Sequence, residues 1–157
     1  MSATPQKITL SLWFDGCAEE AAQFYVDTFG DGRIVNVSRH GEGGPRPAGE
    51  VMAATFELFG QTYAAINGGG EFAFTPALSL LVSCETQAEI DRYWDRLADG
   101  GKPMRFGWIA DRFGLTWQIV PARLKSMLSS EHAGRVMAAA CQMSKIDLAA
   151  LLRAAEA

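Results

Sequence analysis

This sequence of 157 residues is poor in the residue types that build metal and disulfide sites. It contains two histidines and three cysteines. The cysteines (Cys17, Cys84 and Cys141) are odd in number and lack the paired spacing typical of zinc ligands. We therefore expect neither a disulfide framework nor a cysteine–histidine metal site. Free thiols of this kind fit a cytoplasmic protein best.

Long apolar runs and runs of like charge are also missing. No apolar stretch approaches the roughly 18 residues needed to cross a membrane. Residues 1–7 lack the apolar core of a signal peptide. The net charge is −4 and the isoelectric point is about 5.2, whereas binding to nucleic acid needs a basic face. We expect neither nucleic acid nor a membrane as a partner.

What the chain does contain is an internal repeat. Three motifs recur at a separation of 68 residues: Leu10-Ser11-Leu12 with Leu78-Ser79-Leu80, Tyr25 with Tyr93, and Asp31-Gly32 with Asp99-Gly100. A further pair, Phe59-Gly60 and Phe113-Gly114, is separated by 54 residues. Such repeats indicate one supersecondary unit present twice, with about 14 extra residues in the first copy.

Each copy has the pattern of a βαβββ module. Alternation of apolar and polar residues predicts strands over 8–14, 33–38, 51–58 and 61–67, with a helix over 17–29. In the second copy we expect strands over 77–84, 104–110 and 115–120, a short strand near 102–104, and a helix over 86–98. The expected organisation is a single domain, 1–157, with modules at 8–67 and 77–121. Residues 122–157 are expected to form a helical tail, whose last helix would open at a capping box over 144–147.

The repeat and its motifs resemble the vicinal oxygen chelate superfamily, which includes glyoxalase I, extradiol dioxygenases, and bleomycin- and fosfomycin-resistance proteins. Within it the chain resembles the PhnB-like group described as 3-demethylubiquinone-9 3-methyltransferase. The stretches that carry the resemblance are 8–16, 19–21, 24–25, 66–69, 82–84, 107–108, 111–114, 117–121 and, in the tail, 145–147. Many members of the group carry Gln-Cys-Gly-Trp where this chain has Arg105-Phe106-Gly107-Trp108, so a role for that cysteine is absent here.

The resemblance implies an α+β fold in which two tandem βαβββ modules form a cup-shaped pair of half-barrels. Because successive strand residues point to opposite faces, Leu10, Leu12 and Phe14 should pack on the helices, as should Leu78, Leu80 and Val82. Trp117 should also face the helix side. The side chains expected to line a ligand pocket in the cup are Thr9, Ser11, Trp13, Thr55, Thr62, Ser79, Leu81, Ile109 and Gln118.

The resemblance also implies where a metal would be held, on the first and last strands of each module. The corresponding positions lie at or next to Thr9, Ala64, Ala77 and Gln118, of which only Gln118 offers a possible ligand. The glycine run 68–70 leads into no expected helix, unlike the glycine loops that bind nucleotides. We therefore expect no metal and no cofactor.

These features favour a metal-independent protein that binds a small molecule of unknown identity in the cup, with no catalytic residue assigned. The alternatives are an enzyme, either a divergent metal-dependent lyase or dioxygenase or a methyltransferase as the family description has it, and an interaction module whose cup is filled. Trp13 fits both ligand stacking and filling of the cup. An apolar stripe in the tail, Val136, Met137, Ala140 and Cys141, predicts a homodimer that uses the tail.

Overall fold

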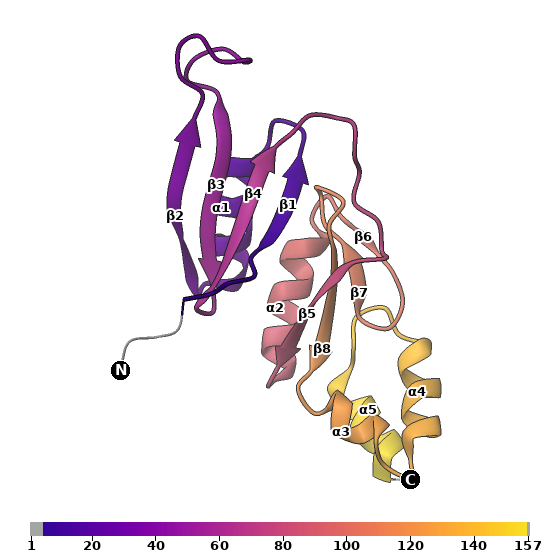
Figure 1. Ribbon diagram of the computed structural model, residues 1–157. Coiled ribbons are helices and arrows are strands. Elements are labelled where there is room, and N and C mark those ends of the chain that lie inside the picture. Colours follow the sequence, from indigo (N-terminus) through magenta and orange to yellow (C-terminus); the bar gives the residue numbers. More distant parts are fainter. Residues whose placement is uncertain (1–4, 157) are drawn as a thin grey trace. The chain divides into compact units, whose positions relative to one another are not determined.

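The computed structural model describes residues 5–156 and divides into two compact units, 1–73 and 74–157 (Figure 1). Each unit contains one βαβββ module, which confirms the repeat. The first consists of β1 (Leu10–Phe14), α1 (Ala18–Phe29), β2 (Gly32–Arg39), β3 (Val51–Leu58) and β4 (Gln61–Asn67). Its sheet has the order β1-β4-β3-β2, with β1 parallel to β4 and the other pairs antiparallel.

The sequence determines which face of this first sheet α1 covers. Leu12 and Phe14 are 2% and 3% exposed, and they lie on the same face as Phe56, which packs near Tyr25 of α1 with ring centroids 6.0 Å apart. The strand alternation therefore gives one apolar face against the helix and one open face, as expected.

The second unit repeats this architecture and adds the tail. Its module consists of β5 (Ser79–Cys84), α2 (Gln87–Ala98), β6 (Lys102–Pro103), β7 (Trp108–Ala110) and β8 (Thr116–Pro121). The sheet order is β5-β8-β7-β6, with β5 parallel to β8. Leu80 pairs with Trp117, which is 2% exposed, on the face that packs against α2. Leu78 lies before β5 and is 47% exposed, so the expectation that it packs on a helix was wrong.

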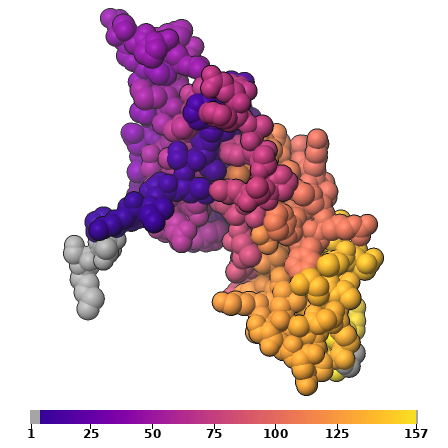
Figure 2. Space-filling model, turned by 45° about the vertical axis from the view of Figure 1, so that its right-hand side comes forward, coloured from indigo at the N-terminus to yellow at the C-terminus, as the bar shows by residue number. Residues whose placement is uncertain are grey.

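The tail forms a helical layer of its own. It contains α3 (Leu124–Leu128), α4 (Ala133–Cys141) and α5 (Leu148–Glu156), which lie together at one end of the second unit (Figures 1 and 2). The last helix begins after Asp147, whose Oδ1 accepts the N–H of Ala150 at 3.1 Å, rather than at the expected capping box. None of the helices among residues 5–156 is long and apolar enough to cross a membrane.

Half of the apolar stripe of the tail, Val136 and Ala140, is buried within its own chain. A single buried cluster joins all three tail helices to the end of β8: Val120, Leu124, Met127, Val136, Ala140, Ile146 and Leu151. Met137 and Cys141, also in the stripe, are exposed. Val136 and Ala140 are therefore covered by the tail helices and β8 and do not face a dimer partner as we expected, whereas the expected homodimer itself stays a prediction.

Polar contacts fasten the tail to α2. The side chain of Gln87 donates to the carbonyl oxygen of Ile146 at 2.9 Å and accepts the N–H of Leu148 at 2.8 Å. Lys145 lies 3.3 Å from Asp91 and 3.1 Å from Asp95. Desolvation lowers the pKa of Lys145, but the two carboxylates outweigh it and raise that pKa overall. The tail is therefore an integral part of the second unit.

Candidate functional site

The open face of the second sheet carries the polar residues expected there. Paired residues of a sheet share a face, so the register of Leu81 with Gln118, and of Gln118 with Trp108, puts these three side chains together. Ser79 lies on the same face, one alternation along β5. The structure thus brings together three of the expected pocket residues, Ser79, Leu81 and Gln118.

Gln118 is held in place by a hydrogen bond across the strands. Its Nε2 donates to Oγ of Ser79 at 2.8 Å. This hydrogen bond orients the carboxamide of Gln118.

Thr116, on the same strand, is 1% exposed, and its Oγ1 has no hydrogen-bond partner among the residues described.

A cavity of about 490 Å³ lies beside Gln118, within the second unit. Its floor comes from β5 and β8, and its opposite wall comes from α3 of the tail. The lining residues are Leu81, Ser83, Phe106, Gln118, Val120, Pro121, Ala122, Leu124, Lys125, Leu128 and Ser129. A mostly apolar cleft of this size with a few polar groups is typical of a small-molecule site.

The wall at Phe106 is fixed to the tail through the main chain. The N–H groups of Phe106 and Gly107 donate to the carbonyl oxygens of Met143 and Ser144, both at 2.8 Å. Gly107 has φ +75°, and a Cβ there would lie 2.6 Å from the carbonyl oxygen of Ile119. Only glycine fits this position without a shift of the main chain. The Phe106-Gly107 motif therefore couples the tail to the pocket.

The sequence analysis did not predict that residues of the tail line this pocket. Leu124 and Leu128 are four residues apart, so they share one side of α3, and that spacing was the available signal. Lys125 between them is exposed and lines the cavity.

The first unit places four other expected residues on its open face. Ser11 and Thr55 each pair with Ala64 of β4, and Trp13 and Thr62 have the same parity as these two residues. Thr9 lies before β1 and is exposed. None of these residues lines the cavity beside Gln118.

Trp13 packs against the segment that follows β4. Its indole Nε1 donates to the carbonyl oxygen of Gly69 at 2.8 Å, and its ring meets the ring of Phe72 edge-on, with centroids 5.0 Å apart. A Cβ on Gly68 would lie 2.2 Å from the indole. The glycine at position 68 therefore has a packing role, and both the ring and the N–H of Trp13 make contacts within its own unit.

Ile109 corrects one expectation. It pairs with Trp117 and is 0% exposed, so it faces α2 and not the open side. At the separation of 54 residues its counterpart is Thr55, which pairs with Ala64 on the open face. The difference comes from the hairpin loop, because a shift of one residue in register moves every side chain to the other face.

Asp111 explains the altered loop. Its carboxylate accepts the N–H groups of Phe113 and Leu115 at 2.8 and 3.1 Å and the indole N–H of Trp117 at 2.9 Å. Asp111 also pairs with Leu115 through the main chain, whereas in the first module Leu58 pairs with Gln61. The second hairpin therefore has one more loop residue.

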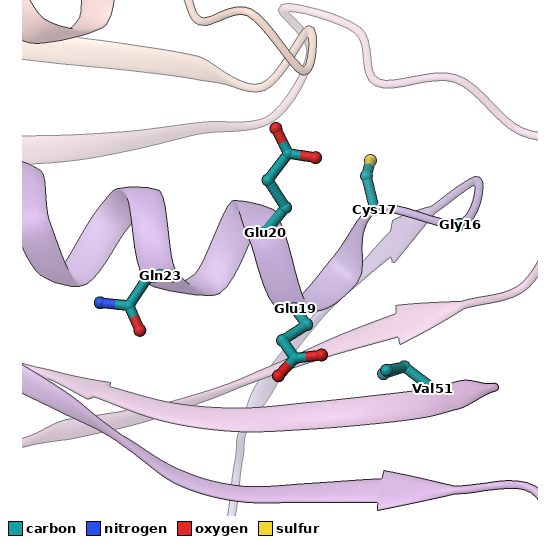
Figure 3. A pocket seen from close by; sticks show the side chains of 6 residues that line it. All are labelled: Gly16, Cys17, Glu19, Glu20, Gln23 and Val51. Atoms are coloured by element: carbon teal, nitrogen blue, oxygen red, sulfur yellow. The ribbon is translucent and has the colours of Figure 1, made fainter. Parts of the chain in front are cut away.

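A second depression of about 400 Å³ lies on the first unit, at the start of α1 (Figure 3). Cys17 and Glu20 point to one side of it, and Glu19 points toward Val51. Burial, and secondarily the charge of Glu20, raises the pKa of the Cys17 thiol, which makes it a poor nucleophile at neutral pH. Glu19 is engaged with Arg39 at 3.4 Å.

The positions that hold metal in the superfamily do not fit a divalent cation here. Ala64 and Ala77 have no side-chain donor atom, so these positions offer only the hydroxyl of Thr9 and the neutral amide oxygen of Gln118, whose Nε2 donates to Ser79. Within residues 5–156, no group of three or more His, Cys, Asp or Glu side chains could hold a metal. The donor set lacks the imidazole and carboxylate ligands that such sites require.

Comparison with known proteins agrees with this architecture. The family model described as 3-demethylubiquinone-9 3-methyltransferase matches residues 6–120. A PhnB protein from Bacillus cereus, which carries the same methyltransferase description, is 41% identical with a TM-score of 0.67, covering 74% of this chain and 98% of its own. Protein PA1353 from Pseudomonas aeruginosa is 22% identical with a TM-score of 0.60, covering 74% and 97%.

More distant structures share the fold alone. The fosfomycin resistance protein FosX from Mesorhizobium loti is 15% identical with a TM-score of 0.56, covering 81% of this chain and 99% of its own. No curated protein matches the chain. The modules have the fold of the vicinal oxygen chelate superfamily. Within it, the chain belongs to the 3-demethylubiquinone-9 3-methyltransferase family of PhnB-like proteins.

The family match ends before the tail. It stops at residue 120, whereas we expected the resemblance to continue through 145–147. The wall that α3 contributes to the cavity therefore lies outside the residues matched by the family model.

Proposed function

We propose that this protein binds a small molecule, without a metal ion, on the open face of its module sheets. The observation that carries the proposal is the cavity of about 490 Å³ between the second sheet and α3, beside the oriented carboxamide of Gln118. Its apolar lining suits an apolar or aromatic body, and Gln118 supplies directional hydrogen bonding. Of the predicted residues, Ser79, Leu81 and Gln118 are assigned to this pocket.

The predicted residues of the first module have a secondary place in this proposal. Ser11, Thr55 and Thr62 stay candidates for contact with a ligand on the open face of the first sheet. Trp13 is assigned a packing role, because its ring and its N–H are already used by the segment 68–72. Thr9 is exposed, and Ile109 is withdrawn from the site.

The methyltransferase description of the family is not extended to this chain. Gly68, which opens the glycine run after β4, is explained by the close approach of Trp13. The chain from Gly68 leads into β5 without an intervening helix, so it does not form the glycine loop at a helix N-terminus that binds nucleotides. A cytoplasmic location and a homodimer remain predictions from the sequence.

The proposal is tested with a neutral apolar dye, N-phenyl-1-naphthylamine, titrated into the full chain and followed by its fluorescence. We expect saturable binding that EDTA leaves unchanged. Leu81→Asp removes apolar contact and puts a charge on the cavity lining, and Ser83→Trp occupies part of the cavity. Each should weaken binding at least about tenfold. Both residues are exposed, so the fold should tolerate the changes.

The matched control is Leu78→Asp. Leu78 is 47% exposed and lies outside the cavity lining, whereas Leu81 is 57% exposed and lies in it. Loss of dye binding in all three variants, or in none, would reject the pocket as the binding site.

A further inference from the structure

The lining of the cavity carries a single charge, which is positive. Lys125 is the only charged residue among those lining it, and no carboxylate contributes to the lining. Lys125 makes no ion pair with another described residue, although the chain as a whole carries a net charge of −4. A ligand charge in this cavity would therefore meet a cation and no competing anion.

The cavity has a charged residue, Lys125, at its exposed rim and buried apolar residues in its interior. Leu124 and Val120 are 7% and 3% exposed, and they belong to the cavity lining together with Leu128. Lys125, in the same helix, is exposed. The hydroxyl of Ser129 at the end of α3 also lines the cavity and donates to the carbonyl oxygen of Lys125 at 2.9 Å. The wall is therefore amphipathic.

We propose that the cavity selects a small apolar or aromatic anion, such as a carboxylate, whose body lies against Leu81 and Leu128 and whose charge lies beside Lys125. This inference rests on the proposed function and adds the chemical class of the ligand. It also gives the tail a role in recognition, because α3 supplies the cation. A lysine at an open rim strengthens binding modestly, and salt weakens its contribution.

Two dyes with one skeleton test this. N-phenyl-1-naphthylamine is neutral, and 1-anilinonaphthalene-8-sulfonate is the same skeleton with an anionic sulfonate. In the full-length chain, Lys125→Met should raise the Kd of the sulfonate about threefold to tenfold and leave that of the neutral dye within about twofold. The effect of the substitution should shrink as salt is raised.

Lys102→Met is the matched control. Lys102 is exposed on β6 and does not line the cavity, so the same loss of charge should leave both affinities unchanged. Equal Kd values for the sulfonate in wild-type and Lys125→Met protein would overturn the charge inference, and so would an equal loss from Lys102→Met. If Leu81→Asp still weakens the neutral dye, the proposed function survives that result. If Leu81→Asp leaves the neutral dye unaffected, the pocket itself is rejected.

Discussion

Gln118 and Ser79 meet across β8 and β5, with Nε2 of the glutamine 2.8 Å from Oγ of the serine. Gln118 occupies the one superfamily metal position of this chain that has a possible ligand. The hydrogen bond to the serine orients the carboxamide of Gln118. The other three superfamily metal positions are occupied by two alanines and an exposed threonine. This pair links the two main claims, a site without metal and a pocket with an oriented polar group.

The first prediction concerns metal content. Protein purified without a histidine tag or chelator should contain no stoichiometric zinc, nickel, iron, manganese or magnesium by elemental analysis. A lone neutral carboxamide binds divalent cations too weakly to retain them through purification. One equivalent of any of these metals, lost in Gln118→Ala, would contradict the account.

The second prediction concerns Trp13 and Gly68. Gly68→Ala should lower the free energy of unfolding by about 1–3 kcal/mol, because the new methyl group would collide with the indole and force it to move. The measurement is the urea midpoint. Gly41→Ala is the control, since a Cβ at Gly41 meets nothing within 4 Å, and its effect should stay within about 0.5 kcal/mol. Equal effects of the two substitutions would show that the indole is free to move aside.

The three cysteines should react in a fixed order. Cys141 is exposed, Cys17 is half-buried, and Cys84 is buried. Burial, with a smaller part from Glu89, raises the pKa of Cys84 to about 12. Since the thiolate is the reactive form, Cys84 has almost none of it at pH 8.

With Ellman's reagent at pH 8, we therefore expect a fast phase that Cys141→Ser removes, a slower phase from Cys17, and reaction of Cys84 only in denaturant. Raising the pH toward 9 should speed the Cys17 phase, because more of its thiol ionises. Fast reaction of Cys84 in the native chain would contradict the burial described.

How much of the fold could be predicted from the sequence depended on the kind of sequence pattern. The 68-residue repeat predicted both modules, and the alternation around Leu12 and Leu81 predicted their open faces. The register of the second hairpin could not be read in the same way. Its extra loop residue is stabilised by the Asp111 carboxylate, and the repeat motif Phe-Gly is identical in both hairpins. Ile109 was therefore placed on the wrong face.

The tail shows a second limit of sequence reasoning. Its apolar stripe was correctly recognised, but a stripe does not specify its partner. Val136 and Ile146 could have faced a second copy of the chain or their own module, and the structure buries both completely in the second unit. The docking contacts of Gln87 are polar and 59 or more residues distant in sequence, so no local pattern indicated them.

A homodimer remains our prediction, now without the tail stripe as its basis. Each sheet ends in two edge strands, β1 and β2 in the first and β5 and β6 in the second, and edge strands favour pairing or cover. Light scattering should give twice the 17.0 kDa of one chain. Met137→Lys, at a tail position that is 43% exposed, should leave that mass unchanged.

A chain that stays monomeric at high micromolar concentration would reject the dimer. Dissociation of the dimer by Met137→Lys alone would instead show that the tail is part of the dimer interface.

The proposed pocket is tested most directly by mapping a bound probe onto the sequence. In a ¹H–¹⁵N correlation spectrum of the full chain, saturation with N-phenyl-1-naphthylamine should shift the amides of β5, β8 and α3 most, together with the side-chain amide of Gln118. The same titration of Leu81→Asp should produce little change in these signals. Shifts centred on other elements, such as the depression at Cys17 and Glu20, or no saturable shifts at β5, β8 and α3, would contradict the account.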